Sequence, residues 1–133
     1  MDFKSKIRRI PEFKGVVFWD ITTLLKDKDA FRECIRKLAD HYRDKHIDIV
    51  ASSEARGFII GGALAHELGA GFVPIRKKGM LPFEVVSLTY KKEYETDTIE
   101  IHKDAIKPGQ KVLLIDDLLA TGGTIKALSL IHI

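Results

Sequence analysis

Apolar residues recur along this chain at two spacings, one typical of helices and one typical of strands. From Asp29 onward, apolar side chains recur at helical spacing with charged side chains between them, which predicts an amphipathic helix. A run rich in small residues over 58–68 predicts a second helix, which Gly69 would end. Short apolar runs predict buried strands at 47–51, 72–75 and 112–115.

Residues 83–102 alternate between polar and apolar side chains, which predicts a β-hairpin with a charged, polar middle at 91–97. Strands that alternate with helices along the chain predict an α/β fold, with a central parallel sheet flanked by helices. In such sheets, ligands bind beyond the carboxyl ends of the strands. The predicted loops at those ends are 52–57, 76–82 and 116–124.

The last of these loops follows the strand at 112–115 and combines residues that attract a phosphate with residues that repel it. Asp116 and Asp117 come directly after the strand, and a turn of small residues at 120–124 then leads into a predicted helix. Free backbone N–H groups and the positive end of a helix dipole suit a phosphate, whereas two carboxylates repel it. Both features are explained if the ligand also carries hydroxyl groups or a metal ion, as a phosphorylated sugar does. A P-loop and a dinucleotide-binding fingerprint are excluded, because neither Gly-Lys-Ser/Thr nor Gly-x-Gly-x-x-Gly is present.

This motif resembles the signature with which type I phosphoribosyltransferases bind 5-phosphoribosyl 1-pyrophosphate (PRPP). Basic residues in the other two loops suit the same ligand. Arg56 lies beside Gly57 in one loop, and Arg76, Lys77 and Lys78 are consecutive in the other. Each group alone is typical of a solvated loop. Their common position at one sheet edge favours neutralisation of a pyrophosphate, which is the leaving group of PRPP.

Composition narrows the class of protein. With 133 residues, of which 45% are hydrophobic and 31% charged, the chain is expected to form a single soluble domain. A net charge of +3 does not indicate nucleic-acid binding, which usually needs a clustered basic face. No apolar run has membrane-spanning length and the N-terminus has no apolar signal core, so we expect neither membrane association nor secretion. The single cysteine, Cys34, excludes an internal disulfide and fits a reducing compartment, so we expect the cytoplasm.

Further motifs extend the resemblance over most of the chain. From about Ile10 to Ala127 the sequence is similar to the adenine phosphoribosyltransferase family. Beside the PRPP motif, the matching segments are Gly15-Val-Val-Phe-Trp-Asp-Ile21, Glu54-Ala-Arg-Gly-Phe58, Val73-Pro-Ile-Arg-Lys77, Lys92-Glu-Tyr94 and Glu100-Ile-His-Lys-Asp-Ala-Ile-Lys-Pro-Gly109. The resemblance implies transfer of the 5-phosphoribosyl group from PRPP to adenine, which gives AMP and pyrophosphate in purine salvage. It also implies Mg²⁺ carried by PRPP, and a homodimer.

The resemblance implies which residues bind PRPP. The pyrophosphate would be bound by Arg56, Arg76, Lys77 and Lys78. The ribose hydroxyls would be bound by Asp116 and Asp117, directly or through water on Mg²⁺, with no side chain coordinating the metal directly. The 5′-phosphate would be held by Ala120, Thr121, Gly122, Gly123 and Thr124.

The base-binding and catalytic residues are implied in the same way. Val17 and Phe18 would contact adenine, with Phe18 stacked on the ring. Glu93, in the hairpin tip, would be catalytic together with Arg56. The composition of the tip alone is typical of a solvated loop. The functional alternative is a lid that closes and excludes water, with Glu93 as a general base or as a stabiliser of the cationic sugar.

The chain departs from the family pattern at three places. Met80 stands where a lysine that contacts pyrophosphate is common, and Glu95 stands where a glycine is usual. Family members continue with further strands, whereas residues 128–133 do not resemble that continuation. We therefore expect residues 1–133 to form a single phosphoribosyltransferase domain that is incomplete at its C-terminus, with the C-terminal strands missing.

Two other functions stay open. The same fold can transfer phosphoribose to xanthine or to hypoxanthine and guanine, although the segment Val16-Val-Phe-Trp19 favours adenine. A PRPP-sensing regulator would bind PRPP without reacting. Such a regulator usually carries an added DNA-binding domain, of which this sequence gives no sign.

Overall fold

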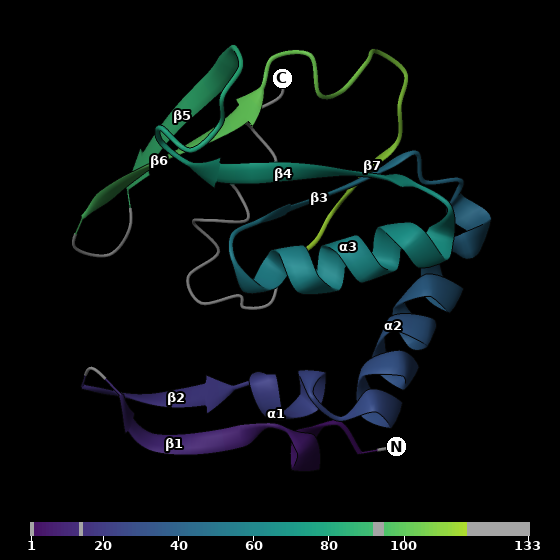
Figure 1. Cartoon of the computed structure of the whole chain (residues 1–133), viewed down its shortest axis with the longest axis vertical. Helices are drawn as coiled ribbons and strands as arrows, with labels where there is room; N and C mark the ends of the chain where they lie inside the picture. Colours follow the sequence, from purple (N-terminus) through teal and green to yellow (C-terminus); the bar gives the residue numbers. More distant parts are fainter. Residues whose placement is uncertain (1, 14, 92–94, 117–133) are drawn as a thin grey trace. The chain divides into compact units, whose positions relative to one another are not determined.

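The computed structural model describes residues 2–13, 15–91 and 95–116 (Figure 1). They belong to two compact units, residues 1–41 and residues 42–133. A single domain over the whole chain stays a prediction. No helix in the described ranges is long and apolar enough to cross a membrane.

The first unit contains a β-hairpin and two helices. After the 3-10 turn η1 (Lys4–Lys6), β1 (Arg8–Phe13) pairs antiparallel with β2 (Val16–Asp20). The helices α1 (Thr22–Leu25) and α2 (Lys28–Tyr42) follow. The sequence pattern did not predict β1, because its residues do not alternate between polar and apolar. Pairing with β2 satisfies its backbone groups and makes this segment a strand.

The amphipathic helix predicted from Asp29 is confirmed as α2. Its buried residues are Ala30, Ile35 and Ala39. The Asp27 carboxylate caps the helix, because Oδ1 accepts hydrogen bonds from the backbone N–H groups of Asp29 and Ala30, both at 3.1 Å. Its Oδ2 lies 3.0 Å from Lys6 Nζ. The start of α2 is therefore fixed both to its own cap and to η1.

The second unit is built around a five-stranded sheet in the order β5-β6-β4-β3-β7. Its strands are β3 (Ile49–Ser53), β4 (Gly71–Lys77), β5 (Val85–Lys91), β6 (Thr96–His102) and β7 (Val112–Leu114). β3 pairs in parallel with both β4 and β7, whereas β5 and β6 form an antiparallel hairpin that joins the sheet at β4. The 3-10 turn η2 (Arg43–Lys45) precedes β3, and α3 (Arg56–Leu68) connects β3 to β4. The predicted α/β fold, with a parallel centre and a hairpin, is confirmed.

The two faces of the sheet bury different residues. The apolar core cluster consists of Ala51, Val73, Ile75, Ile99 and Ile101. Because side chains alternate along a strand, Ser52 and Phe72 lie on the opposite face, along which α3 runs (Figure 1). There the ring of Phe72 meets the ring of Phe58 edge-on, with 5.7 Å between the centroids. The helix therefore covers one face, and the aliphatic cluster forms on the other.

The strands at the centre of the sheet run further than the apolar pattern predicts. β3 continues through Ser53, and β4 continues through Arg76 and Lys77. Polar residues extend these strands because their backbones stay paired: Ser53 with β4, and the two basic residues with β6. α3 likewise begins at Arg56, two residues before the predicted start. Residues that the pattern assigns to loops thus belong to regular elements.

α3 lies against β3 through a buried serine and two glycines. The Ser52 side chain is fully buried, and its hydroxyl donates a hydrogen bond to the backbone oxygen of Gly57 at 2.7 Å. A Cβ added at Gly61 would lie 2.6 Å from Ser52 Oγ and 3.0 Å from the Phe72 ring. A side chain at Gly61 would therefore not fit between α3 and β3 unless Ser52 or the helix moved.

Gly61→Ala is expected to destabilise the protein, although alanine favours helix formation. The added methyl collides with Ser52, whose hydrogen bond keeps it in place, and we expect a loss of about 1–3 kcal/mol. Gly62→Ala is the matched control, because a Cβ there meets nothing within 4 Å. That change should raise stability by about 0.5–1 kcal/mol. Urea unfolding followed by circular dichroism measures both, and equal stability of the two variants would contradict the close packing of α3.

Candidate active site

Polar groups from three chain segments lie at the carboxyl ends of β3, β4 and β7. Glu54 follows β3, Arg76 and Lys77 end β4, and Asp116 lies just beyond β7. The first turn of α3, which begins at Arg56, lies at the same edge. The structure therefore brings together charged residues that are far apart in the sequence.

The Glu54 carboxylate connects the end of β3 to the end of β4. Its oxygens accept hydrogen bonds from Arg76 Nε at 3.3 Å, from Arg76 Nη2 at 3.2 Å and from the Lys77 backbone N–H at 2.7 Å. Partial burial works against its ionisation, but the Lys77 amide and the Arg76 guanidinium outweigh this effect and lower the pKa of Glu54. The guanidinium carbon of Arg76 also lies 5.9 Å from the centre of the Phe58 ring. Arg76 is consequently fixed on two sides.

The Asp116 carboxylate lies against the start of α3. The Ser53 hydroxyl donates a hydrogen bond to Asp116 Oδ2 at 3.2 Å. A Cβ added at Gly57 would lie 3.2 Å from Asp116 Oδ1 and 3.3 Å from Ser52 Cβ. The glycine therefore leaves room for the acidic group beside the first turn of the helix.

The remaining predicted site residues are placed only in part. Glu93, Asp117, Ala120, Thr121, Gly122, Gly123 and Thr124 lie outside the described residues. Lys78 is exposed in the turn after β4, and Arg56 is half-buried. Val17 and Phe18 lie in β2 of the first unit, and only the backbone of these two residues is described.

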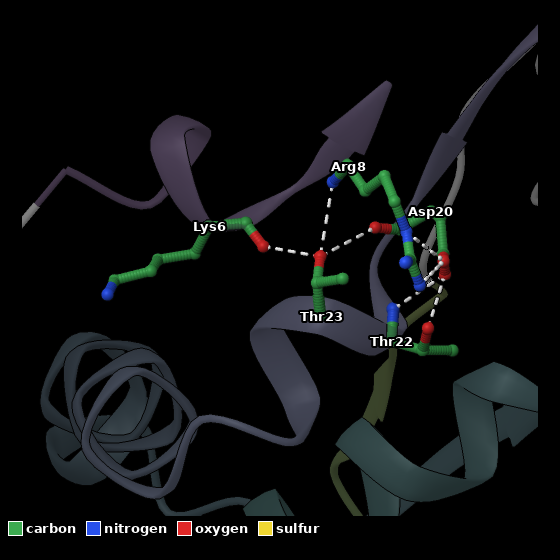
Figure 2. Close-up of polar contacts among 5 residues, drawn as sticks. All are labelled: Lys6, Arg8, Asp20, Thr22 and Thr23. Atoms are coloured by element: carbon green, nitrogen blue, oxygen red, sulfur yellow. Dashed lines mark hydrogen bonds and ion pairs between the residues drawn. The ribbon is translucent and has the colours of Figure 1, made fainter. Parts of the chain in front are cut away.

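Hydrogen bonds around Asp20 fix the end of β2 (Figure 2). Asp20 Oδ2 accepts from Arg8 Nη2 at 2.8 Å, and Oδ1 accepts from the Thr22 hydroxyl at 2.6 Å and the Thr22 N–H at 2.9 Å. The Thr23 hydroxyl accepts from the Arg8 N–H at 3.1 Å and donates to the Lys6 carbonyl at 2.6 Å. The bonds from Thr22 and then from Arg8 lower the pKa of Asp20 from 3.8 to about 2. The strand that carries the predicted adenine contacts is thereby tied to β1 and α1.

Asp20→Asn is expected to remove an acid-sensitive part of the stability. Because the pKa of Asp20 in the folded state lies below its ordinary value of 3.8, the carboxylate stabilises the fold above that value and loses this effect as the pH falls toward 2. Wild type should therefore exceed the variant in stability near neutral pH, and the difference should shrink in acid. Urea unfolding over this pH range measures it, with Asp104→Asn, at an exposed aspartate, as the control. A difference that does not change with pH would contradict the assignment.

Two polar residues near the site gave no local signal in the sequence. Ser53 lies in a segment that reads as a loop, and Glu100 alternates with isoleucines as a solvent-facing strand residue does. Yet Glu100 is only 7% exposed. Their contacts join residues 63 and 21 positions apart, respectively. Only the assembled sheet reveals them.

The described residues at this edge offer cations from the end of β4 and the start of α3, and a carboxylate from Asp116, which is a combination that suits a phosphorylated sugar. Residues 20–132 match the phosphoribosyl transferase domain family. Because the match spans most of the chain, the chain belongs to this family.

Several proteins of known name are similar to this chain over nearly its whole length. The chain is 59% identical over 129 residues to the adenine phosphoribosyltransferase of Halothermothrix orenii, covering 96% of this chain and 76% of the relative. The crystal structure of adenine phosphoribosyltransferase from Thermoanaerobacter pseudethanolicus matches with a TM-score of 0.91 and 52% identity, over 96% of this chain and 75% of that chain. The Saccharomyces cerevisiae enzyme, solved with an imino-altritol bisphosphate and adenine, matches with a TM-score of 0.90 and 38% identity, over 96% and 76% of the two chains. Within the family, the chain is therefore grouped with the adenine phosphoribosyltransferases.

Proposed function

We propose that this protein transfers the 5-phosphoribosyl group of PRPP to adenine and releases pyrophosphate, which makes AMP in purine salvage. The observation that carries the proposal is the 59% identity to an adenine phosphoribosyltransferase over nearly the whole chain. The charged edge formed by β3, β4, β7 and the start of α3 supports it, because it offers both cations and a carboxylate to one ligand.

In this proposal, the cations at the edge bind the leaving group. Arg56, Arg76, Lys77 and Lys78 would neutralise the pyrophosphate. Arg76 is already oriented by Glu54, so its remaining donors need little rearrangement to meet a phosphate oxygen. A charge that is in place before the substrate arrives stabilises the separated charges of the transition state without further reorganisation.

In the same proposal, the two adjacent carboxylates bind the sugar of PRPP. Asp116 and Asp117 would accept hydrogen bonds from the ribose hydroxyls, and the turn at 120–124 would bind the 5′-phosphate. Ser53 keeps the Asp116 carboxylate in one orientation through its hydrogen bond. As the bond from the sugar carbon to pyrophosphate breaks, the sugar becomes cationic. The base nitrogen then forms the new bond and loses its proton, for which Glu93 is the candidate acceptor.

Magnesium fits the chemistry of the acidic group. The Asp116 carboxylate is half-exposed and offers oxygen ligands, which Mg²⁺ prefers. Asp116 and Asp117 would hold the ion through its water, and it would supply neutralisation of the pyrophosphate charge. We also propose a homodimer in the cytoplasm without nucleic-acid or membrane partners, on the strength of the family resemblance and of a single cysteine, which suits a reducing compartment.

The choice of base is tested by AMP formation from PRPP, Mg²⁺ and adenine, with hypoxanthine, guanine and xanthine supplied in parallel. We expect turnover of adenine alone, because the residues around Val17 and Phe18 match the adenine-specific pattern. Preferred turnover of another base would show that the protein is specific for that base and not for adenine. PRPP binding without turnover of any base would favour a regulator.

The role of the acidic pair is tested by changing both Asp116 and Asp117 to asparagine. Loss of the two charges should lower kcat/KM for PRPP by at least about a hundredfold, since both groups would act on the sugar as charge develops. Steady-state kinetics measure the effect, and Asp104→Asn at an exposed position is the control. Turnover within a few-fold of wild type would refute the assigned role.

A further inference from the structure

Glu100 is a buried carboxylate beside the cationic end of β4. Among the described residues it is the only charged side chain that is buried, with 7% of its surface exposed. It lies on β6, directly opposite Arg76 on β4 and Ser87 on β5. Residues opposite each other in antiparallel strands share a face of the sheet, so the three side chains form one row across it.

Both oxygens of Glu100 have a partner at a defined distance. Oε1 accepts a hydrogen bond from the Gly79 backbone N–H at 2.8 Å, and Oε2 accepts one from the Ser87 hydroxyl at 2.6 Å. The Ser87 hydroxyl, the Gly79 amide and the nearby Lys78 charge outweigh burial and lower the pKa of Glu100. The group is therefore ionised at neutral pH and accepts at both oxygens.

The contact to Gly79 fixes the turn that carries two of the cations. The Met80 N–H donates to the Lys77 carbonyl at 3.3 Å, and Gly79 has a φ of 85°, so the chain reverses directly after β4. Glu54 binds the first two residues of the basic run 76–78, through the Arg76 side chain and the Lys77 amide. Glu100 binds the residue directly after this run. Two carboxylates beside the cations Arg76, Lys77 and Lys78 reduce the positive potential there. A need for strong positive charge therefore does not account for the carboxylates, whereas a need for fixed geometry does.

We propose that Glu100 is a positioning residue for pyrophosphate. By binding the Gly79 amide and the Ser87 hydroxyl, it keeps the turn after β4 in the conformation that presents Lys77 and Lys78 to the leaving group of PRPP. This inference rests on the proposed function of the site. Glu100 acts through hydrogen bonds to both of its oxygens, so the shape of its side chain matters more than its negative charge.

Glu100→Ala removes both contacts and tests the proposal. We expect KM for PRPP and Kd for inorganic pyrophosphate to rise about tenfold, because displacement of positioned groups by about an ångström is enough for such a loss. The values of kcat and of KM for adenine should stay within about twofold, as expected when only binding of one substrate is affected. Steady-state kinetics and calorimetric titration with pyrophosphate supply these values.

Two further variants separate geometry from charge. In Glu100→Gln, the amide oxygen can accept from Gly79 while the NH₂ group donates to Ser87, so this variant should recover most of the affinity. Ser87→Ala leaves only the Gly79 contact and should fall between wild type and Glu100→Ala. Glu84→Ala is the matched control, because the same change is made at an exposed glutamate of the loop before β5.

A purely structural role would give a different pattern. Glu100→Ala would then lower the melting temperature and the active fraction, and hence kcat, with KM for PRPP and Kd for pyrophosphate unchanged; that result overturns the proposal. Wild type that binds pyrophosphate without turning over adenine would refute the proposed function, while the calorimetric comparison would still decide the role of Glu100. Wild type that binds neither PRPP nor pyrophosphate would overturn both.

Discussion

The close contact between α3 and β3 is the constraint on which the rest of the site depends. Ser52 is buried between the strand and the helix, and the absence of side chains at Gly57 and Gly61 lets the two backbones approach. The helix start is therefore held at the carboxyl end of β3. Arg56 and the space for Asp116 are both consequences of this contact, because a helix further from the sheet would move its first turn away from the ends of β3 and β7.

Two carboxylates fix the geometry of the chain segment that carries the cations. Glu54, which follows β3, binds Arg76 and the Lys77 amide at the end of β4, and Glu100 on β6 binds the Gly79 amide and the Ser87 hydroxyl. Each oxygen of the two carboxylates accepts a hydrogen bond. Side chains of arginine and lysine lose considerable conformational entropy when they become ordered. Backbone amides that are already fixed, and a guanidinium that is already oriented, avoid part of this loss when a ligand binds. The carboxylates thus weaken the attraction of the cations for a ligand, but they order the groups that bind it.

Much of the fold could be predicted from sequence, because its main elements have regular hydrophobic periods. α2 and β7 are found where the apolar pattern places them, and α3 ends at the predicted residue but begins two residues earlier than predicted. β1 could not be predicted, since its strand character comes from pairing with β2 rather than from its own residues. The ends of β3 and β4 were placed too early for the same reason, as Ser53 and Lys77 stay paired although they are polar.

The candidate site likewise has a part that could be predicted from the sequence and a part that could not. The acidic pair and the basic loops follow from residue types at predicted strand ends, and Asp116, Arg76 and Lys77 do lie at one edge. The contacts that orient these residues could not be predicted. Ser53 and Glu100 act on groups that are distant in the chain, and the burial of Glu100 requires that β4, β5 and β6 be assembled side by side.

The edge of the sheet that carries the candidate site has a cationic half, at the end of β4, and an acidic half, beyond β7. The contacts that hold the two halves join chain segments of very different length. The Glu54–Arg76 contact joins residues 22 positions apart, whereas the Ser53–Asp116 contact joins residues 63 positions apart. Closure of the shorter segment costs less entropy, and contacts that are local in sequence form sooner. During synthesis, β3, α3 and β4 leave the ribosome before β7 exists. The cationic half of the edge can consequently fold while the chain is still growing, and the acidic half is added only when β7 inserts beside β3.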